Sequence, residues 1–126
     1  MLKQQLIQNY TAEITCITCN RVKPFDPYII MRLKAKNLIE EYKRNDEGKM
    51  IIKTKEFELE EIKEEGIKKK EGFKIKKEKG QLTEEEIEKA LLIILQVKGW
   101  NINDIKANGS EDFVEKANKE KYSLFF

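Results

Sequence analysis

Cys16 and Cys19 are the only two cysteines of the chain, which contains no histidine. Two thiolates at this spacing can make half of a tetrahedral zinc site, or they can form one redox or disulfide pair. The missing zinc ligands would have to be carboxylates or the same two cysteines of a second chain. A third interpretation is that two small side chains only pack at the end of a strand. For the metal interpretation, we expect Cys16 and Cys19 to bind zinc at a dimer interface, where two chains share one ion.

A second group of candidate residues lies in the lysine-rich stretch after residue 67. If residues 67–79 form a hairpin, its lysines make a ribbon that can lie on the phosphates of a nucleic acid. The stretch has no arginine for bidentate contacts with bases, and Phe73 is its only aromatic side chain for stacking. The alternative is a solvated edge hairpin, where lysines discourage the addition of further strands. The candidate nucleic-acid-binding residues are Lys68, Lys69, Lys70, Lys74, Lys76 and Lys77.

Catalysis has little support in the sequence. Histidine, the commonest general base, is absent, and Gly66, Gly72 and Gly80 are scattered rather than arranged in a phosphate-binding loop. The acidic run 84–86 lies where a helix begins, and acidic residues stabilise a helix N-terminus for electrostatic reasons alone. We therefore expect no catalytic residue and no cofactor other than the zinc described above.

One segment near the C-terminus combines a helix, Gly99-Trp100, an extended stretch and then Ser110-x-Asp112-Phe-Val. This order resembles the first half of the restriction-endonuclease-like core. The resemblance implies that Asp112 binds a metal ion and that the next strand supplies a Glu-x-Lys motif. That strand would be 122–126, and no Glu-x-Lys occurs there. The resemblance thus implies an incomplete metal-dependent nuclease, whereas the residues themselves favour Asp112 as a first-turn residue of a helix.

The composition is typical of a single globular domain over residues 1–126. Hydrophobic residues make up 40% of the chain and charged residues 38%, and the net charge of +2 creates no global field that would attract nucleic acid or an anionic membrane. Residues 1–10 lack the apolar core of a signal peptide, and the longest apolar run, Ala90–Leu95, is far too short to span a bilayer. We expect a soluble, cytoplasmic protein with no membrane partner.

The hydrophobic pattern predicts an α+β fold in which two main helices pack on a small, mostly antiparallel sheet. The first helix, 27–44, begins at Asp26-Pro27, a strong start signal. The second, 84–98, begins with a capping box of Thr83 and Glu86. Two segments, 56–66 and 110–126, fit either a helix or an extended conformation. A short helix is predicted at 2–9, and strands are predicted at 12–18, 49–55, 67–79 and 100–105.

These features favour a small, cytoplasmic, non-catalytic binding or regulatory protein that forms a homo-oligomer, most simply a homodimer. The grounds are the missing acid–base residues, the half metal site, the helix 84–98 that is apolar on most sides, and the apolar C-terminal residues Leu124–Phe126. A compact chain with few motifs suits a virus or a mobile element. The alternative function is nucleic-acid binding through 68–79, and a weaker one is the incomplete nuclease.

Overall fold

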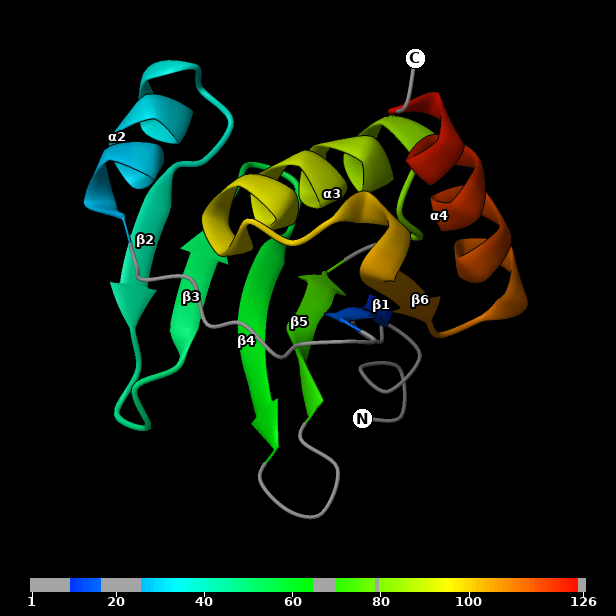
Figure 1. The fold of residues 1–126 in the computed structure, drawn as a ribbon, viewed down its shortest axis with the longest axis horizontal. Coiled ribbons are helices and arrows are strands. Elements are labelled where there is room, and N and C mark those ends of the chain that lie inside the picture. The colour runs from blue at the N-terminus through cyan, green and yellow to red at the C-terminus, as the bar shows by residue number, and fades with distance from the viewer. Residues whose placement is uncertain (1–9, 17–25, 65–69, 79, 125–126) are drawn as a thin grey trace, which may run out of the picture.

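The computed structural model describes residues 10–16, 26–64, 70–78 and 80–124 of the chain. These residues form a six-stranded antiparallel sheet with the strand order β2-β3-β4-β5-β1-β6 and three helices (Figure 1). The predicted α+β fold is confirmed. The elements, in chain order, are β1 (Tyr10–Cys16), α2 (Pro27–Ala35), β2 (Glu41–Arg44), β3 (Met50–Lys53), β4 (Glu58–Glu64), β5 (Lys70–Lys77), α3 (Glu84–Lys98), a short 3-10 helix (Ile102–Asp104), β6 (Ile105–Asn108) and α4 (Glu111–Ser123).

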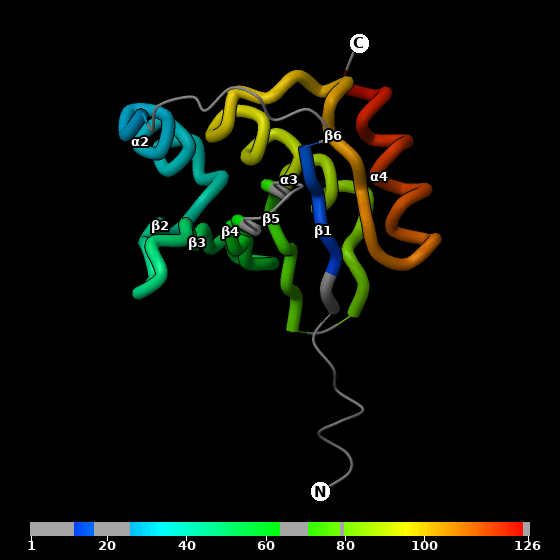
Figure 2. Tube along the Cα trace, turned by 60° about the horizontal axis from the view of Figure 1, so that its bottom comes forward, coloured from blue at the N-terminus to red at the C-terminus, as the bar shows by residue number. Residues whose placement is uncertain are grey.

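The core lies between the sheet and a layer of helices. Helix α3 crosses the sheet, with α2 near β2 at one end and α4 beside β6 at the other (Figures 1 and 2). Alternate side chains of each strand point toward these helices because successive residues of a strand face opposite sides of a sheet. The fully buried strand residues facing this layer include Ile14, Ile52, Leu59, Phe73 and Ile75.

Helix α3 has the bounds that the sequence predicts. The Thr83 side chain accepts from the Glu86 backbone N–H, the Glu86 side chain accepts from the Thr83 N–H, and Gly99 ends the helix in the left-handed region at φ 70°. Both signals are local, which explains why the sequence alone places them. None of the described helices is long and apolar enough to cross a membrane.

The helix predicted over 27–44 is shorter than expected. It ends at Ala35, and 41–44 forms the strand β2. Asn37 adopts a left-handed φ of 60°, and the Leu38 N–H returns to the Leu33 carbonyl at 2.9 Å, which closes the helix. Asparagine is one of the few residues besides glycine that adopts this conformation readily. The apolar side chains of Ile39 and Tyr42 continue a helical spacing in the sequence, but they lie beyond the end of α2.

The hairpin considered for residues 67–79 does not form within the described residues, because 70–77 is one continuous strand, β5. This strand lies inside the sheet between β4 and β1, so the expectation of an edge hairpin was wrong. Gly72 allows β1 to pass close to β5, because a Cβ atom at this position would lie 2.4 Å from the Ile14 carbonyl oxygen.

The structure also decides the two ambiguous segments and adjusts the other strands. The first segment is extended as β4, and the second is the helix α4, whose Ser110 side chain accepts from the Phe113 N–H at 3.2 Å. The strand predicted at 49–55 spans Met50–Lys53, and the one predicted at 100–105 begins only at Ile105, after the 3-10 turn. The helix predicted at 2–9 and residues 17–18 of the first predicted strand lie outside the described residues.

Candidate functional site

Cys16 is the last residue of β1, and it lies opposite Ile105 of β6. The structure records Cys16 as disulfide-bonded, and Cys19 lies outside the described residues. In the part of the chain that the structure describes, no group of three or more Asp, Glu or Cys side chains is arranged to hold a metal ion. The shared zinc site stays a prediction for the reduced protein.

The candidate lysines of β5 are placed among carboxylates. Lys76 forms an ion pair with Glu60, and Lys77 lies 2.6 Å from Glu86 and also donates to the Gln81 carbonyl. Lys74 lies in register with Glu60 on one side and Glu13 on the other. Of the remaining candidates, Lys70 is the first residue of β5, whereas Lys68 and Lys69 lie outside the described residues.

The sheet face turned away from the helices places lysines and glutamates at facing positions. The cross-strand partners include Lys53 with Glu58, Glu58 with Lys76, Glu60 with Lys74, and Lys74 with Glu13. Opposite charges at facing positions stabilise a sheet and neutralise one another. This face therefore lacks the unbroken positive field that attracts a phosphate backbone.

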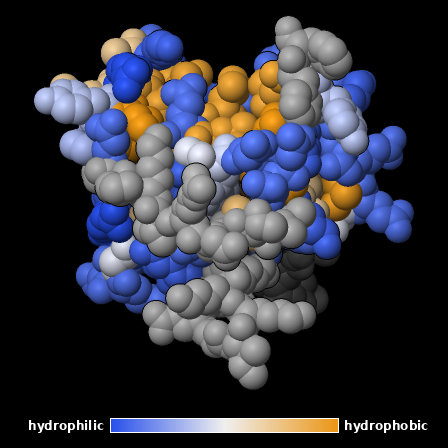
Figure 3. Space-filling model, in the orientation of Figure 1, coloured by the Kyte–Doolittle hydropathy of each residue, from blue (hydrophilic) through white to orange (hydrophobic). Residues whose placement is uncertain are grey.

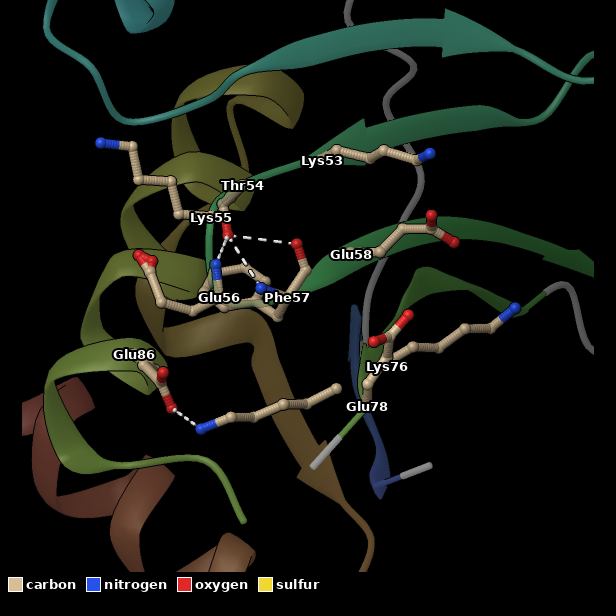
Figure 4. A pocket seen from close by; sticks show the side chains of 10 residues that line it. Lys53, Thr54, Lys55, Glu56, Phe57, Glu58, Lys76, Glu78 and Glu86 are labelled. Atoms are coloured by element: carbon tan, nitrogen blue, oxygen red, sulfur yellow. Dashed lines mark hydrogen bonds and ion pairs between the residues drawn. The ribbon is translucent and has the colours of Figure 1, made fainter. Parts of the chain in front are cut away.

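A charged cleft of about 620 Å³ opens beside the turn between β3 and β4 (Figure 4). Its wall at the turn is rigid, because the Thr54 hydroxyl accepts from the N–H groups of Glu56 and Phe57 and donates to the Phe57 carbonyl. On the opposite wall, Lys77 reaches Glu86 at the start of α3. The lining side chains are Lys53, Thr54, Lys55, Glu56, Phe57, Glu58, Lys76, Lys77, Glu78 and Glu86.

Glu86, which lines the cleft, and Glu60, the ion-pair partner of the lining residue Lys76, are poor general acids. Burial alone would raise the pKa of Glu86, but hydrogen bonds from Lys77 and the Thr83 backbone hold it below its ordinary value. The hydrogen bond from Lys76 lowers the pKa of Glu60 in the same way. A general acid needs a pKa raised toward neutrality, so both groups are suited to binding and not to proton donation.

A buried ion pair between β4 and α3 was not predicted from the sequence. Glu61 is only 2% exposed; it accepts from the Met50 N–H at 3.0 Å and forms an ion pair with Lys98, the last residue of α3. The Lys98 ammonium also lies 5.7 Å from the ring centre of Phe73 and 5.8 Å from that of Trp100. The one signal in the sequence is that Glu61 shares the inward-facing alternation of Leu59.

Asp112 lies in the first turn of α4, where it is exposed and forms a 3.0 Å ion pair with Lys116. The segment after it is helical as far as Ser123, so no strand follows that could carry a Glu-x-Lys motif within the described residues. A different carboxylate of α4 is buried: Glu120 is 8% exposed. Burial, together with the neighbouring Glu88 and Glu84 of α3, raises the pKa of Glu120.

Helix α2 has apolar side chains on two opposite faces. Ile29, Ile30 and Leu33 are buried in the core, whereas Tyr28 and Met31 are 69% and 63% exposed. Together with Asp26, Arg32 and Ala35, these two exposed side chains line a shallow hollow. Hydrophobic side chains gather along the top of the molecule, where Figure 1 places α2 and α3, while hydrophilic ones cover the flanks (Figure 3).

The two terminal strands of the sheet differ in how they are covered. Helix α4 packs against β6, and the Lys121 ammonium donates to the Ile105 carbonyl at 3.1 Å. At the other end, β2 pairs with β3, and none of the described helices makes a comparable contact with β2. An uncovered terminal strand presents backbone donors and acceptors to any strand of suitable sequence.

Comparison of the chain with protein-family models, with curated proteins and with solved structures found no match to any of them.

Proposed function

We propose that this chain is a small, non-catalytic binding or regulatory protein that works as a self-associated assembly. The observation that carries the proposal is the outer face of α2, which exposes Tyr28 and Met31 although the inner face is filled with core residues. A helix that is apolar on opposite faces is typical of an element buried between two layers. The described residues of one chain supply only the first of these layers.

A second copy of α2 has the chemistry that this outer face requires. Asp26 caps the start of the helix, and Arg32 and Lys34 lie in its last turn. In an antiparallel pair of α2 helices related by a two-fold axis, the acidic end of each helix lies beside the basic end of the other, and the two macrodipoles run in opposite directions. The charges at the helix ends and the exposed apolar side chains thus both favour an antiparallel pair of α2 helices.

The exposed face of α2 alone is too small for a stable interface. A helix of nine residues is about 14 Å long, whereas a stable interface buries about 800 Å² on each partner. The assembly therefore requires a further contact next to α2.

The charges of β5 weigh against the nucleic-acid alternative. Lys76 and Lys77 are ion-paired with Glu60 and Glu86, and replacing these partners by phosphates would leave carboxylates beside the bound polyanion.

Sedimentation velocity over a range of protein concentrations tests the proposal. The wild-type chain is expected to dimerise, and Met31→Asp is expected to weaken the dimer at least about tenfold, because it places a charge in an apolar interface. The matched control is Tyr122→Asp, which changes a 65% exposed aromatic side chain on α4, far along the chain from α2. A wild-type chain that stays monomeric at high concentration would refute self-association.

A further inference from the structure

The five residues around β2 form a charge pattern that is complementary to itself. Glu40 and Glu41 precede Tyr42, and Lys43 and Arg44 follow it. When such a segment is placed antiparallel to a second copy of itself with Tyr42 opposite Tyr42, every acidic residue faces a basic one. Within β2 the facing pair is Glu41 with Lys43, and the two-fold axis generates it twice. Glu40 precedes the strand, and its N–H donates to the Lys53 carbonyl at 2.8 Å, so a contact between Glu40 and Arg44 would lie just beyond the paired strands.

The geometry of a sheet selects this register over its neighbours. A two-fold axis that extends a sheet by antiparallel pairing must stand perpendicular to the sheet, so each side chain faces a partner on the same side of the sheet. The axis must therefore pass beside one residue, which then faces its own copy. An axis between two neighbouring residues would pair side chains that point to opposite sides of the sheet. An axis beside Lys43 would place two lysines opposite each other, and like charges at facing positions destabilise a sheet. An axis beside Tyr42 avoids this repulsion.

The side chains of β2 have the orientation that this pairing requires. Tyr42 lies opposite Ile52 and packs against the core on the helix side, whereas Lys43 lies opposite Ile51 on the other face, where it is exposed. Glu41 lies 3.9 Å from Lys53 of its own chain, and its side chain is 52% exposed, so it remains accessible to a second partner.

The same two-fold axis brings the α2 helices of the two copies close to the interface. Because the axis is perpendicular to the sheet, the helices of both copies lie on the same side of the combined sheet. Helix α2 lies on the β2 side of the molecule (Figure 2). The axis therefore places the α2 helices of the two copies on the same side of the combined sheet, one on each side of the β2 pair.

We propose that two copies of this chain pair antiparallel through β2, in the register centred on Tyr42, so that two six-stranded sheets become one continuous sheet. This inference rests on the proposed self-association and names the surface and the partner, a second copy of the chain. The contact supplies the additional interface that α2 lacks.

Charge swaps at two positions test the register directly. Glu41→Lys alone creates two facing pairs of lysines, and Lys43→Glu alone creates two facing pairs of glutamates. Each variant is expected to raise the dimer dissociation constant about tenfold. An equimolar mixture of the two variants is expected to restore wild-type affinity as a heterodimer, because lysines at 41 and 43 of one chain then face glutamates at 43 and 41 of the other. The double variant Glu41→Lys/Lys43→Glu is expected to regain the homodimer.

The measurement is sedimentation velocity of this equimolar mixture, with one of the two variants fluorescently labelled. Lys106→Glu on β6 is the matched control, because it reverses an exposed lysine of the opposite terminal strand and is expected to leave the dimer unchanged. A wild-type dimer that both single variants preserve, or that their mixture fails to restore, would overturn the β2 register while leaving self-association intact. A monomeric wild-type chain would overturn both the β2 register and the proposed self-association. It would do so even if β2 then pairs with a strand of another protein.

Discussion

Glu61 in the middle of the sheet and Lys98 at the end of α3 form an ion pair inside the core, with side-chain exposures of 2% and 17%. The Met50 N–H gives Glu61 a second hydrogen bond, and two aromatic rings flank the Lys98 ammonium. This pair fixes the end of α3 to β4, and so it links the helix layer to the strand whose turn bounds the charged cleft.

Lys98→Met is expected to destabilise the protein by about 3–5 kcal/mol, because it leaves the Glu61 carboxylate buried without its partner. Equilibrium unfolding in urea measures this loss. The double variant Glu61→Leu/Lys98→Met is expected to recover much of the stability, since it removes both charges together. Lys63→Ala is the control: Lys63 lies 3.8 Å from Glu61 but is 51% exposed, and its loss should cost less than about 1 kcal/mol.

The same pair is expected to make the protein sensitive to acid. Burial acts to raise the pKa of Glu61, but the hydrogen bonds from Lys98 and Met50 outweigh it, so the folded-state pKa lies below the ordinary value of 4.5. A carboxyl group with a lowered pKa contributes stability that is present above its unfolded-state pKa and is lost as the pH falls through the folded-state pKa. Thermal unfolding between pH 7 and pH 3 should show this loss, and Glu61→Leu/Lys98→Met should show less of it.

Glu120 is expected to act in the opposite direction. Burial and the nearby Glu88 and Glu84 raise its pKa above the ordinary value of 4.5, so the folded protein holds this proton more tightly than the unfolded chain does. Stability from this site is therefore present at low pH and falls as the pH rises from the unfolded-state pKa to the folded-state pKa. Glu120→Gln should raise the unfolding temperature at pH 7 and flatten this pH dependence. Glu115→Gln, an exposed change on the same helix, serves as the comparison.

Gly72→Ala is expected to destabilise the sheet by more than about 2 kcal/mol, because the new Cβ atom would meet backbone atoms that cannot move aside. The contacts would be 2.4 Å to the Ile14 carbonyl oxygen and 2.9 Å to the Thr15 Cα atom. Gly48→Ala provides the contrast. Nothing lies within 4 Å of its added Cβ, so only its positive φ of 78° opposes the change, at about 1 kcal/mol. Equal effects of the two substitutions on urea unfolding would contradict this explanation.

We expect β5 to bind nucleic acid weakly, and we expect its ion-paired lysines to add no affinity. In gel shifts at several salt concentrations, Lys76→Gln should change the affinity for single- or double-stranded DNA less than about twofold, since Lys76 is already ion-paired with Glu60. A loss of tenfold or more, with a reduced dependence on salt, would instead support the lysine ribbon.

The parts of the fold that local signals determine are those that the sequence predicts well. The bounds of α3 follow from Thr83, Glu86 and Gly99, which act within a few residues of one another. The errors arise where a residue has its role through a distant partner. Gly72 is a turn residue by composition, but it lies within a strand because β1 passes close to it.

The candidate sites show the same division. The lysines of β5 form a run in the sequence, yet the pairing of β5 with β4 places glutamates beside them. Glu61 appears as one of many charged residues, and only the approach of α3 reveals that its carboxylate is buried. The self-complementary pattern around Tyr42 is visible in the sequence, but it acquires a meaning only once β2 is known to be the terminal strand.

The strand order also bears on the cysteines. Between β2 and β1 lie three other strands, so two chains paired through β2 would hold their Cys16 residues about 40 Å apart, at about 4.8 Å for each strand. A zinc ion shared by two chains would then require a second interface on the opposite side of each molecule.

The opposite end of the sheet is β6, where the Lys121 ammonium donates a hydrogen bond to the Ile105 carbonyl. A molecule whose sheet could be extended at both ends would polymerise, each added copy exposing a fresh strand for the next. In the proposed dimer, pairing through β2 would use that terminal strand in both copies, while α4 packs against β6 and Lys121 donates to the Ile105 carbonyl at the other end. Among the described residues no uncovered terminal strand would then remain, so the assembly would stop at two copies instead of continuing as a fibre.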